Sequence, residues 1–307
     1  MILLNVARPF GTADPVELAR DALAAGLDGV ALADSPRLFP DCLVETERVL
    51  SGTDARLAGP CVLSLGLRHP AAVAGAVRTL DAHHPGRVLA VVGRGESSVR
   101  NEGLAPPSLR AYEASLDTLR ELVPASTRLL GAASGPRTIR STAARLGGVL
   151  VDAGADPAIV GKAVALARSA RPDAAVWVFA RAVVTDNEAQ ADAAAAPVLG
   201  SCAARLVRAP DWFDVPADLR DAVAAAAEAH DYRRHGTADA RQGDVPAGTD
   251  RFVRDRFVVT GDVSAVAARF AAFGALGVDG VVLAGALGGV LDRLADLATA
   301  VRDGLQP

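Results

Sequence analysis

The chain has few aromatic residues and little net charge. The first restricts the composition of its core, and the second restricts the class of its partners. Phe, Trp and Tyr make up 4% of the 307 residues, although 50% of the residues are hydrophobic. The core must therefore consist mostly of Ala, Val and Leu. The net charge is −4 and the basic residues are scattered along the chain, which argues against nucleic acid as a partner.

Long hydrophobic runs and metal-site spacings are also missing. No apolar run is as long as a membrane span, and no basic region precedes the apolar N-terminus, so we expect neither a membrane partner nor a signal peptide. Cys42, Cys61 and Cys202 lack metal-ligand spacing and cannot all pair within one chain, and the histidines include no His-x-x-x-His. The sequence thus predicts a reduced, cytoplasmic protein without a metal.

What the chain has is a regular alternation of apolar, strand-like runs with alanine-rich amphipathic helices. Strands are expected near residues 2–7, 28–33, 57–63, 88–93, 128–133, 148–152, 175–183 and 278–284. Helix starts are expected at Asp14, Asp156 and Asp262, and helix ends at Gly26, Gly147 and Gly277. Eight such units favour an α/β fold, a single (β/α)8 TIM barrel over residues 1–307, rather than an open sheet.

Two segments depart from this alternation. Residues 186–260 hold too much chain for one crossover, with helical runs expected at 188–207 and 216–230 and a polar, Gly-rich piece at 235–250. This predicts a helical excursion before the last strand. Conversely, the helix expected at 109–123 reaches the next strand through only four residues, a shortened segment after the fourth strand–helix unit.

Residues 57–104 point to a ligand site. The strand near 88–93 is followed at once by Gly93-Arg94-Gly95-Glu96. In parallel α/β proteins, ligands bind at the carboxyl ends of the strands. The segment therefore places a glycine turn, a basic residue and a carboxylate on the reactive face. From the residues alone, Glu96 is also well explained as a surface carboxylate that caps the next helix.

Several motifs in this chain resemble those of the luciferase-like flavin and deazaflavin oxidoreductases. They are Gly59-Pro60-x-Val62, Arg68-His69-Pro70, Thr79-Leu80 with Pro85-Gly86-Arg87, Gly93-x-Gly95-x-Ser97, Asp34-Ser35, residues 132–136, and Gly261-Asp262-Val263 with Gly277-Val278-Asp279. In order and spacing they are most similar to the F420-dependent, methylenetetrahydromethanopterin-reductase-like branch. The resemblance covers nearly the whole chain.

The resemblance implies a deazaflavin site at the third strand. It places Asp34 against the ring system, a non-prolyl cis peptide between Cys61 and Val62 in a bulge that supports the ring, and a coenzyme-bonding hydroxyl at Ser64. Without the resemblance, Asp34 is equally well a cap of the following turn, and Cys61 is a buried thiol.

The same resemblance implies that the Gly93–Glu96 turn contacts the deazaflavin ring. Backbone N–H groups of Arg94 and Gly95 would face the ring carbonyls, and Glu96 would lie beside the reacting carbon, where a half-buried carboxyl can exchange a proton. Arg68-His69-Pro70 is diagnostic of the family but is interpreted as structural, with the arginine bracing the helix start.

A phosphate site is expected where a helix opens directly after the strand at 128–133. Free N–H groups at a helix start bind anions, Gly135 permits close approach, and Arg137 adds charge. The resemblance places the coenzyme phosphate here, on Ser134, Gly135, Arg137 and Thr138. The alternative is an ordinary turn with a solvated arginine.

Three functions are compatible with this pattern. The first is an F420-dependent oxidoreductase that moves a hydride between the deazaflavin and a small organic substrate, reducing a C=C or C=N bond or oxidising an alcohol. The second is an FMN-dependent monooxygenase, and the third is a ligand-binding relative without turnover. Ser35 replaces the catalytic histidine of the sugar-phosphate dehydrogenases, so glucose-6-phosphate oxidation is not expected. The resemblance also implies a homodimer.

Overall fold

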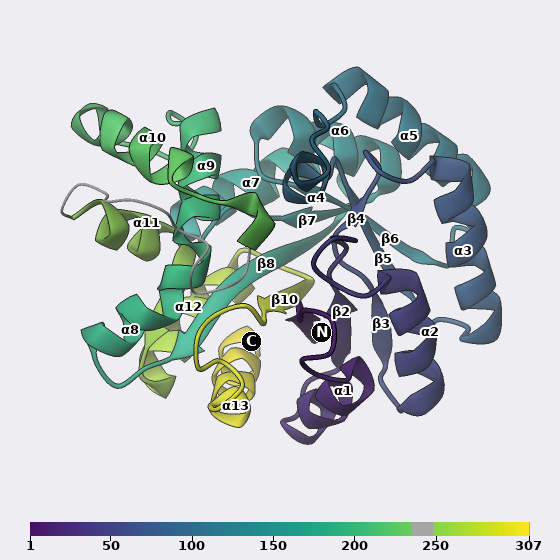
Figure 1. Cartoon of the computed structure of the whole chain (residues 1–307), viewed down its shortest axis with the longest axis horizontal. Coiled ribbons are helices and arrows are strands. Elements are labelled where there is room, and N and C mark those ends of the chain that lie inside the picture. The colour runs from purple at the N-terminus through teal and green to yellow at the C-terminus, as the bar shows by residue number, and fades with distance from the viewer. Residues whose placement is uncertain (235–247, 307) are drawn as a thin grey trace.

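A nearly closed barrel of parallel strands forms the centre of the molecule in the computed structural model, which describes residues 1–234 and 248–306 (Figure 1). The strands are β1 (Ile2–Val6), β2 (Gly29–Leu32), β3 (Leu57–Pro60), β4 (Leu63–Ser64), β5 (Leu89–Gly93), β6 (Arg128–Ala133), β7 (Gly148–Val151), β8 (Ala175–Val184), β9 (Val258–Gly261) and β10 (Gly280–Ala284). β1 lies between β2 and β10, and the order continues from β10 through β8, β7, β6 and β5 to β4. The predicted (β/α)8 barrel is confirmed.

Helices surround this barrel on the outside. They are α1 (Pro15–Ala24), α2 (Cys42–Gly52), α3 (Pro70–His83), α4 (Glu96–Asn101), α5 (Leu109–Leu122), α6 (Pro136–Leu146), α7 (Pro157–Ala170), α12 (Val263–Ala275) and α13 (Leu294–Leu305). The segment from α5 to β6 is as short as expected, because residues 124–127 alone follow the C-cap Val123.

The expected helical excursion lies between β8 and β10, and Figure 1 shows most of it gathered at one side of the barrel. It contains α8 (Glu188–Ala195), η1 (Ala196–Val198), α9 (Leu199–Arg208), η2 (Ala217–Leu219), α10 (Arg220–Glu228), η3 (Tyr232–Arg234) and α11 (Thr249–Phe257). Of the Gly-rich piece expected at 235–250, residues 235–247 lie outside the described residues.

Three details differ from the sequence expectation. The strand expected at 57–63 is divided into β3 and β4 at the Cys61–Val62 peptide, which is cis. The helix expected at 188–207 changes to a 3₁₀ turn at Ala196–Val198, where Pro197 cannot donate a backbone hydrogen bond. β9 and α11 were not expected; β9 pairs only with the end of the long strand β8, so its four residues carried little signal.

Two apolar layers hold the fold together. Alternate strand residues point inward, so that Leu3, Leu89 and Trp177 belong to a small cluster inside the barrel, while neighbours such as Leu4 and Ala90 belong to the larger layer beneath the helices. Both clusters are rich in Ala, Val and Leu, as the low aromatic content predicts. Trp177 is therefore a core residue.

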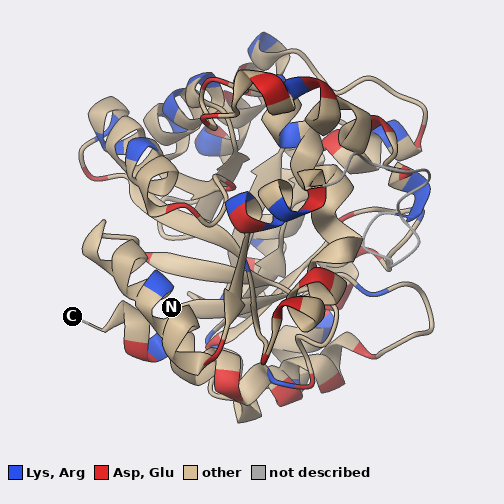
Figure 2. Ribbon diagram, turned by 90° about the vertical axis from the view of Figure 1, so that its left-hand side faces the viewer, with Lys and Arg blue, Asp and Glu red and all other residues tan. Residues whose placement is uncertain are grey.

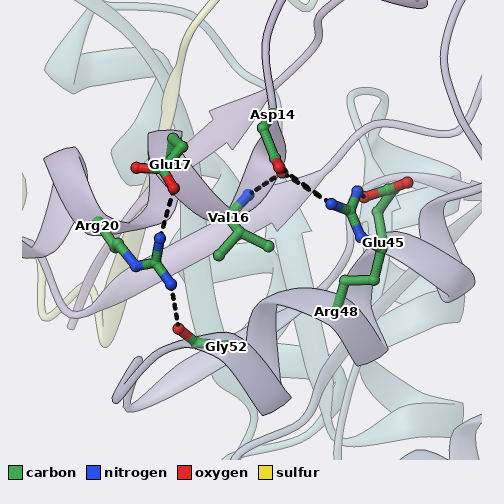
Figure 3. Close-up of polar contacts among 7 residues, drawn as sticks. All are labelled: Asp14, Val16, Glu17, Arg20, Glu45, Arg48 and Gly52. Atoms are coloured by element: carbon green, nitrogen blue, oxygen red, sulfur yellow. Dashed lines mark hydrogen bonds and ion pairs between the residues drawn. The ribbon is translucent and has the colours of Figure 1, made fainter.

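The helix starts follow the expected capping residues. Asp14, Asp156 and Asp262 each accept a backbone N–H of the first helical turn through the side chain. Asp14 also pairs with Arg48 of α2 at 3.0 Å, and Arg20 of α1 donates to the carbonyl of Gly52 at 3.1 Å (Figure 3). These contacts tie α1 to α2.

Charged residues lie mainly on the helices and connecting loops, whereas most of the strand surface carries uncharged residues (Figure 2). Among the described residues, no helix combines the length and apolar character that crossing a membrane requires.

Candidate active site

A cavity of about 300 Å³ opens at the carboxyl ends of the barrel strands. Its lining comes from the ends of almost all barrel strands and from α4, α9 and η3 of the surrounding segments. This size is at the lower end of the range for small-molecule sites. The position is the one at which TIM barrels bind their ligands.

The Cys61–Val62 peptide forms one wall of the cavity and is cis, as the resemblance implied. Asn5, on β1, donates from Nδ2 to the Cys61 carbonyl at 2.7 Å and to the Ala31 carbonyl at 3.2 Å. Asn5 was not recognised from the sequence, because an asparagine inside a strand carries no motif. Burial raises the pKa of the Cys61 thiol and so favours the neutral thiol over the thiolate.

Asp34 lines the cavity at the end of β2, but its carboxylate already has protein partners. It accepts from the Ser64 backbone N–H at 2.9 Å and from Arg68 at 3.0 Å. Arg68 also contacts Asp41, the N-cap of α2, at 2.9 Å. Arg68 therefore braces the start of α2 rather than its own helix, whose N-cap is His69.

Ser64 lies behind the cavity wall. Its side chain is fully buried, and its Oγ has no hydrogen-bond partner among the described residues. Gly95 has a φ of +77°, and a Cβ at this position would lie 1.7 Å from that Oγ. Only glycine fits this turn. The turn therefore brings the backbone of Arg94 and Gly95 against Ser64 of β4.

Glu96 begins α4 and lines the cavity with a half-buried side chain. Arg100 of the same helix contacts Oε1 at 2.7 Å, and Arg208 of α9 contacts Oε2 at 2.9 Å. The sequence predicted the position but not these partners, because Arg208 is more than a hundred residues away in the chain.

The expected phosphate residues are only partly brought together. Ser134 and Thr138 line the cavity, whereas Arg137 is exposed outside it. Gly135 is the N-cap of α6 without a side-chain cap, and the space where its Cβ would lie is open. The first turn of α6 can therefore be approached by an anion.

A buried charged cluster, which sequence reasoning missed, forms the other side of the cavity. Asp152, after β7, contacts Arg181 of β8 at 2.7 Å and Arg205 of α9 at 2.6 Å. Burial would raise the pKa of Asp152, but the two guanidinium groups outweigh it and lower this pKa to about 2. An arginine within the apolar strand 175–183 was the available signal.

No group of three or more His, Cys, Asp or Glu suited to a metal ion occurs among the residues whose positions are described. The ligand chemistry of the cavity is thus that of backbone N–H groups, hydroxyls, carboxylates and guanidinium groups.

Solved structures share this fold over nearly their full length. Coenzyme F420-dependent tetrahydromethanopterin reductase from Methanopyrus kandleri superposes with a TM-score of 0.76 at 16% identity, covering 99% of each chain. An F420-dependent secondary alcohol dehydrogenase, in complex with an F420–acetone adduct, gives 0.71 at 18% identity, also covering 99% of each chain. EDTA monooxygenase from a Chelativorans species gives 0.66 at 13% identity, covering 100% of this chain and 94% of the other.

At these identities, the likeness concerns the fold alone. No curated protein sequence matches the chain. A family model described as luciferase-like monooxygenase, however, matches residues 5–132 and 128–280. That match includes the cis peptide, the glycine turn and the buried charged cluster. The chain therefore belongs to the luciferase-like monooxygenase family.

Proposed function

We propose that this protein is an F420-dependent oxidoreductase that transfers a hydride between the deazaflavin and a small organic substrate. The proposal rests on the cavity wall in which the cis Cys61–Val62 peptide lies beside the Gly93–Glu96 turn. Two of the structures with the same fold are F420-dependent enzymes, which supports the choice of coenzyme.

The residues present fit such a coenzyme. The buried Ser64 Oγ lacks a partner, and the start of α6 is open at Gly135. The ring would lie against Asp34, Cys61, Val62, Arg94 and Gly95, with Ser64 behind them. The phosphate would lie at Ser134, Gly135 and Thr138, with Arg137 on the exposed side of the same helix start. The deazaflavin supplies two-electron hydride chemistry when bound.

The chain's own part in the reaction is to position the reactants and to move a proton. Glu96 lines the cavity and is the group we assign to proton transfer. Its contacts with Arg100 and Arg208 fix the carboxylate at the mouth of the site. A carboxylate at this position can take up the proton that an alcohol releases on oxidation.

The second candidate is an FMN-dependent monooxygenase. The same fold occurs in EDTA monooxygenase, and the family as a whole is described by that activity. A flavin would occupy the same wall of the cavity. The identity of the bound coenzyme therefore distinguishes the monooxygenase from the F420-dependent oxidoreductase.

Titration with each coenzyme, followed by absorbance and calorimetry, tests the proposal. We expect F420 to bind at least about tenfold more tightly than FMN, a difference of about 1.4 kcal/mol. Tighter binding of FMN would establish the second candidate. If neither coenzyme bound, the ligand-binding relative without turnover would replace both.

A further inference from the structure

We propose that the substrate carries an acidic group, a carboxylate or a similar anion, which is held by Arg205 and Arg208 of α9. This inference rests on the proposed function, because it names the substrate class of the same cavity. It concerns the part of the lining contributed by α9, to which no coenzyme contact has been assigned.

The two arginines are placed as a pair. They lie three residues apart on α9, so their side chains project from one face of the helix. Both line the cavity, together with Arg181 of β8. Their side chains are 24% and 44% exposed, which leaves them accessible from the cavity.

This wall carries more positive than negative charge. Asp152 is shared by Arg181 and Arg205, and Glu96 is shared by Arg100 and Arg208. No further carboxylate pairs with these four arginines in the described part of the chain. The partly exposed guanidinium groups of Arg205 and Arg208 can therefore pair with a further anion from the cavity.

Donor atoms also remain available. Arg205 donates through Nε to Asp152 and through Nη1 to the Ser201 carbonyl, and Arg208 uses Nη1 on Glu96. Within residues 1–234 and 248–306, no hydrogen bond engages Nη2 of Arg205, or Nε and Nη2 of Arg208. Burial lowers the pKa of Arg208, as expected for a cation that is incompletely neutralised. Guanidinium groups bind carboxylates through such paired N–H groups.

The position indicates the substrate rather than the coenzyme tail. The open start of α6, where we place the coenzyme phosphate, is formed by Ser134 and Thr138 after β6. Arg208 instead contacts Glu96, the group assigned to proton transfer. An anion held by Arg208 therefore lies beside the reacting group, where the substrate must be.

A ligand-observed NMR titration tests this with two probes of equal size, butyrate and butyramide. We expect butyrate to bind wild-type protein with coenzyme, and its dissociation constant to rise about tenfold or more in Arg208→Gln. Butyramide should bind weakly to both. Arg110→Gln, which removes an exposed arginine from α5, is the matched control and should leave butyrate binding unchanged.

Arg208→Lys keeps the charge and should retain part of the affinity, which separates charge recognition from misfolding. Equal binding of butyrate and butyramide would overturn the inference, as would a loss of F420 affinity in Arg208→Gln with butyrate binding unchanged. Arginine-dependent butyrate binding to a protein that binds no F420 would leave the inference standing and refute the proposed function.

Discussion

At the scale of single residues, the surroundings of each side chain decide its role more than its motif does. Asp34 and Glu96 are both carboxylates at strand ends that line the cavity. Asp34 is buried and bonded to the Ser64 backbone and to Arg68, so it holds the third strand in place. Glu96 is half-buried and lines the cavity. Its carboxylate contacts Arg100 of α4 and Arg208 of α9.

Replacement of Glu96 by Gln tests this assignment. The amide keeps the size of the side chain but cannot exchange the proton, so we expect turnover to fall about a hundredfold or more. Coenzyme affinity should change by no more than a few fold. Steady-state kinetics and F420 titration measure the two effects. Glu102→Gln, which removes an exposed pair with Arg37, is the control. Full turnover in Glu96→Gln would assign proton transfer to another group.

At the scale of elements, the start of α6 is the place where we predict that the coenzyme phosphate binds. The helix begins after Gly135 without a side-chain cap, and Thr138 in its first turn lines the cavity. Because Arg137 is exposed, its charge acts through water and contributes less than a buried guanidinium would.

We therefore expect Arg137→Ala to weaken F420 binding by only about threefold to tenfold, and the effect to shrink at high salt. Calorimetric titration at two ionic strengths provides the measurement. Arg140→Ala, one turn further along α6 and also exposed, should have a smaller effect. Equal losses in the two variants would mean that the phosphate binds away from this helix start.

At the scale of the whole molecule, the excursion after β8 contributes part of the cavity lining and contains a histidine whose surroundings predict a pH dependence of stability. His230 follows α10, and its ring packs against Gly200 of α9. Burial lowers the pKa of His230 to about 4. The unfolded chain, with a histidine pKa near 6.5, therefore binds more protons between these values.

The stability that depends on neutral His230 is thus fully present above pH 6.5 and is lost as the pH falls toward 4. We expect the free energy of unfolding to fall by up to about 1 kcal/mol per pH unit in this window. Urea denaturation at pH 7.5, 6.5 and 5.5 should show a smaller decline in His230→Gln. His83→Gln, in which an exposed histidine is removed, should follow the wild type. Parallel declines in all three proteins would contradict this role.

The sequence by itself determined the barrel and its helix starts, and the family resemblance added the cis peptide between Cys61 and Val62. The barrel and its helix starts depend on local patterns, namely alternating burial in strands and capping aspartates. Only the tertiary structure decided the buried charged cluster, where Asp152, Arg181 and Arg205 meet from three separate elements. Arg181 within an apolar strand was a sequence signal for a buried charge, but the spacing of residues along the chain does not show that Asp152 and Arg205 are its neighbours.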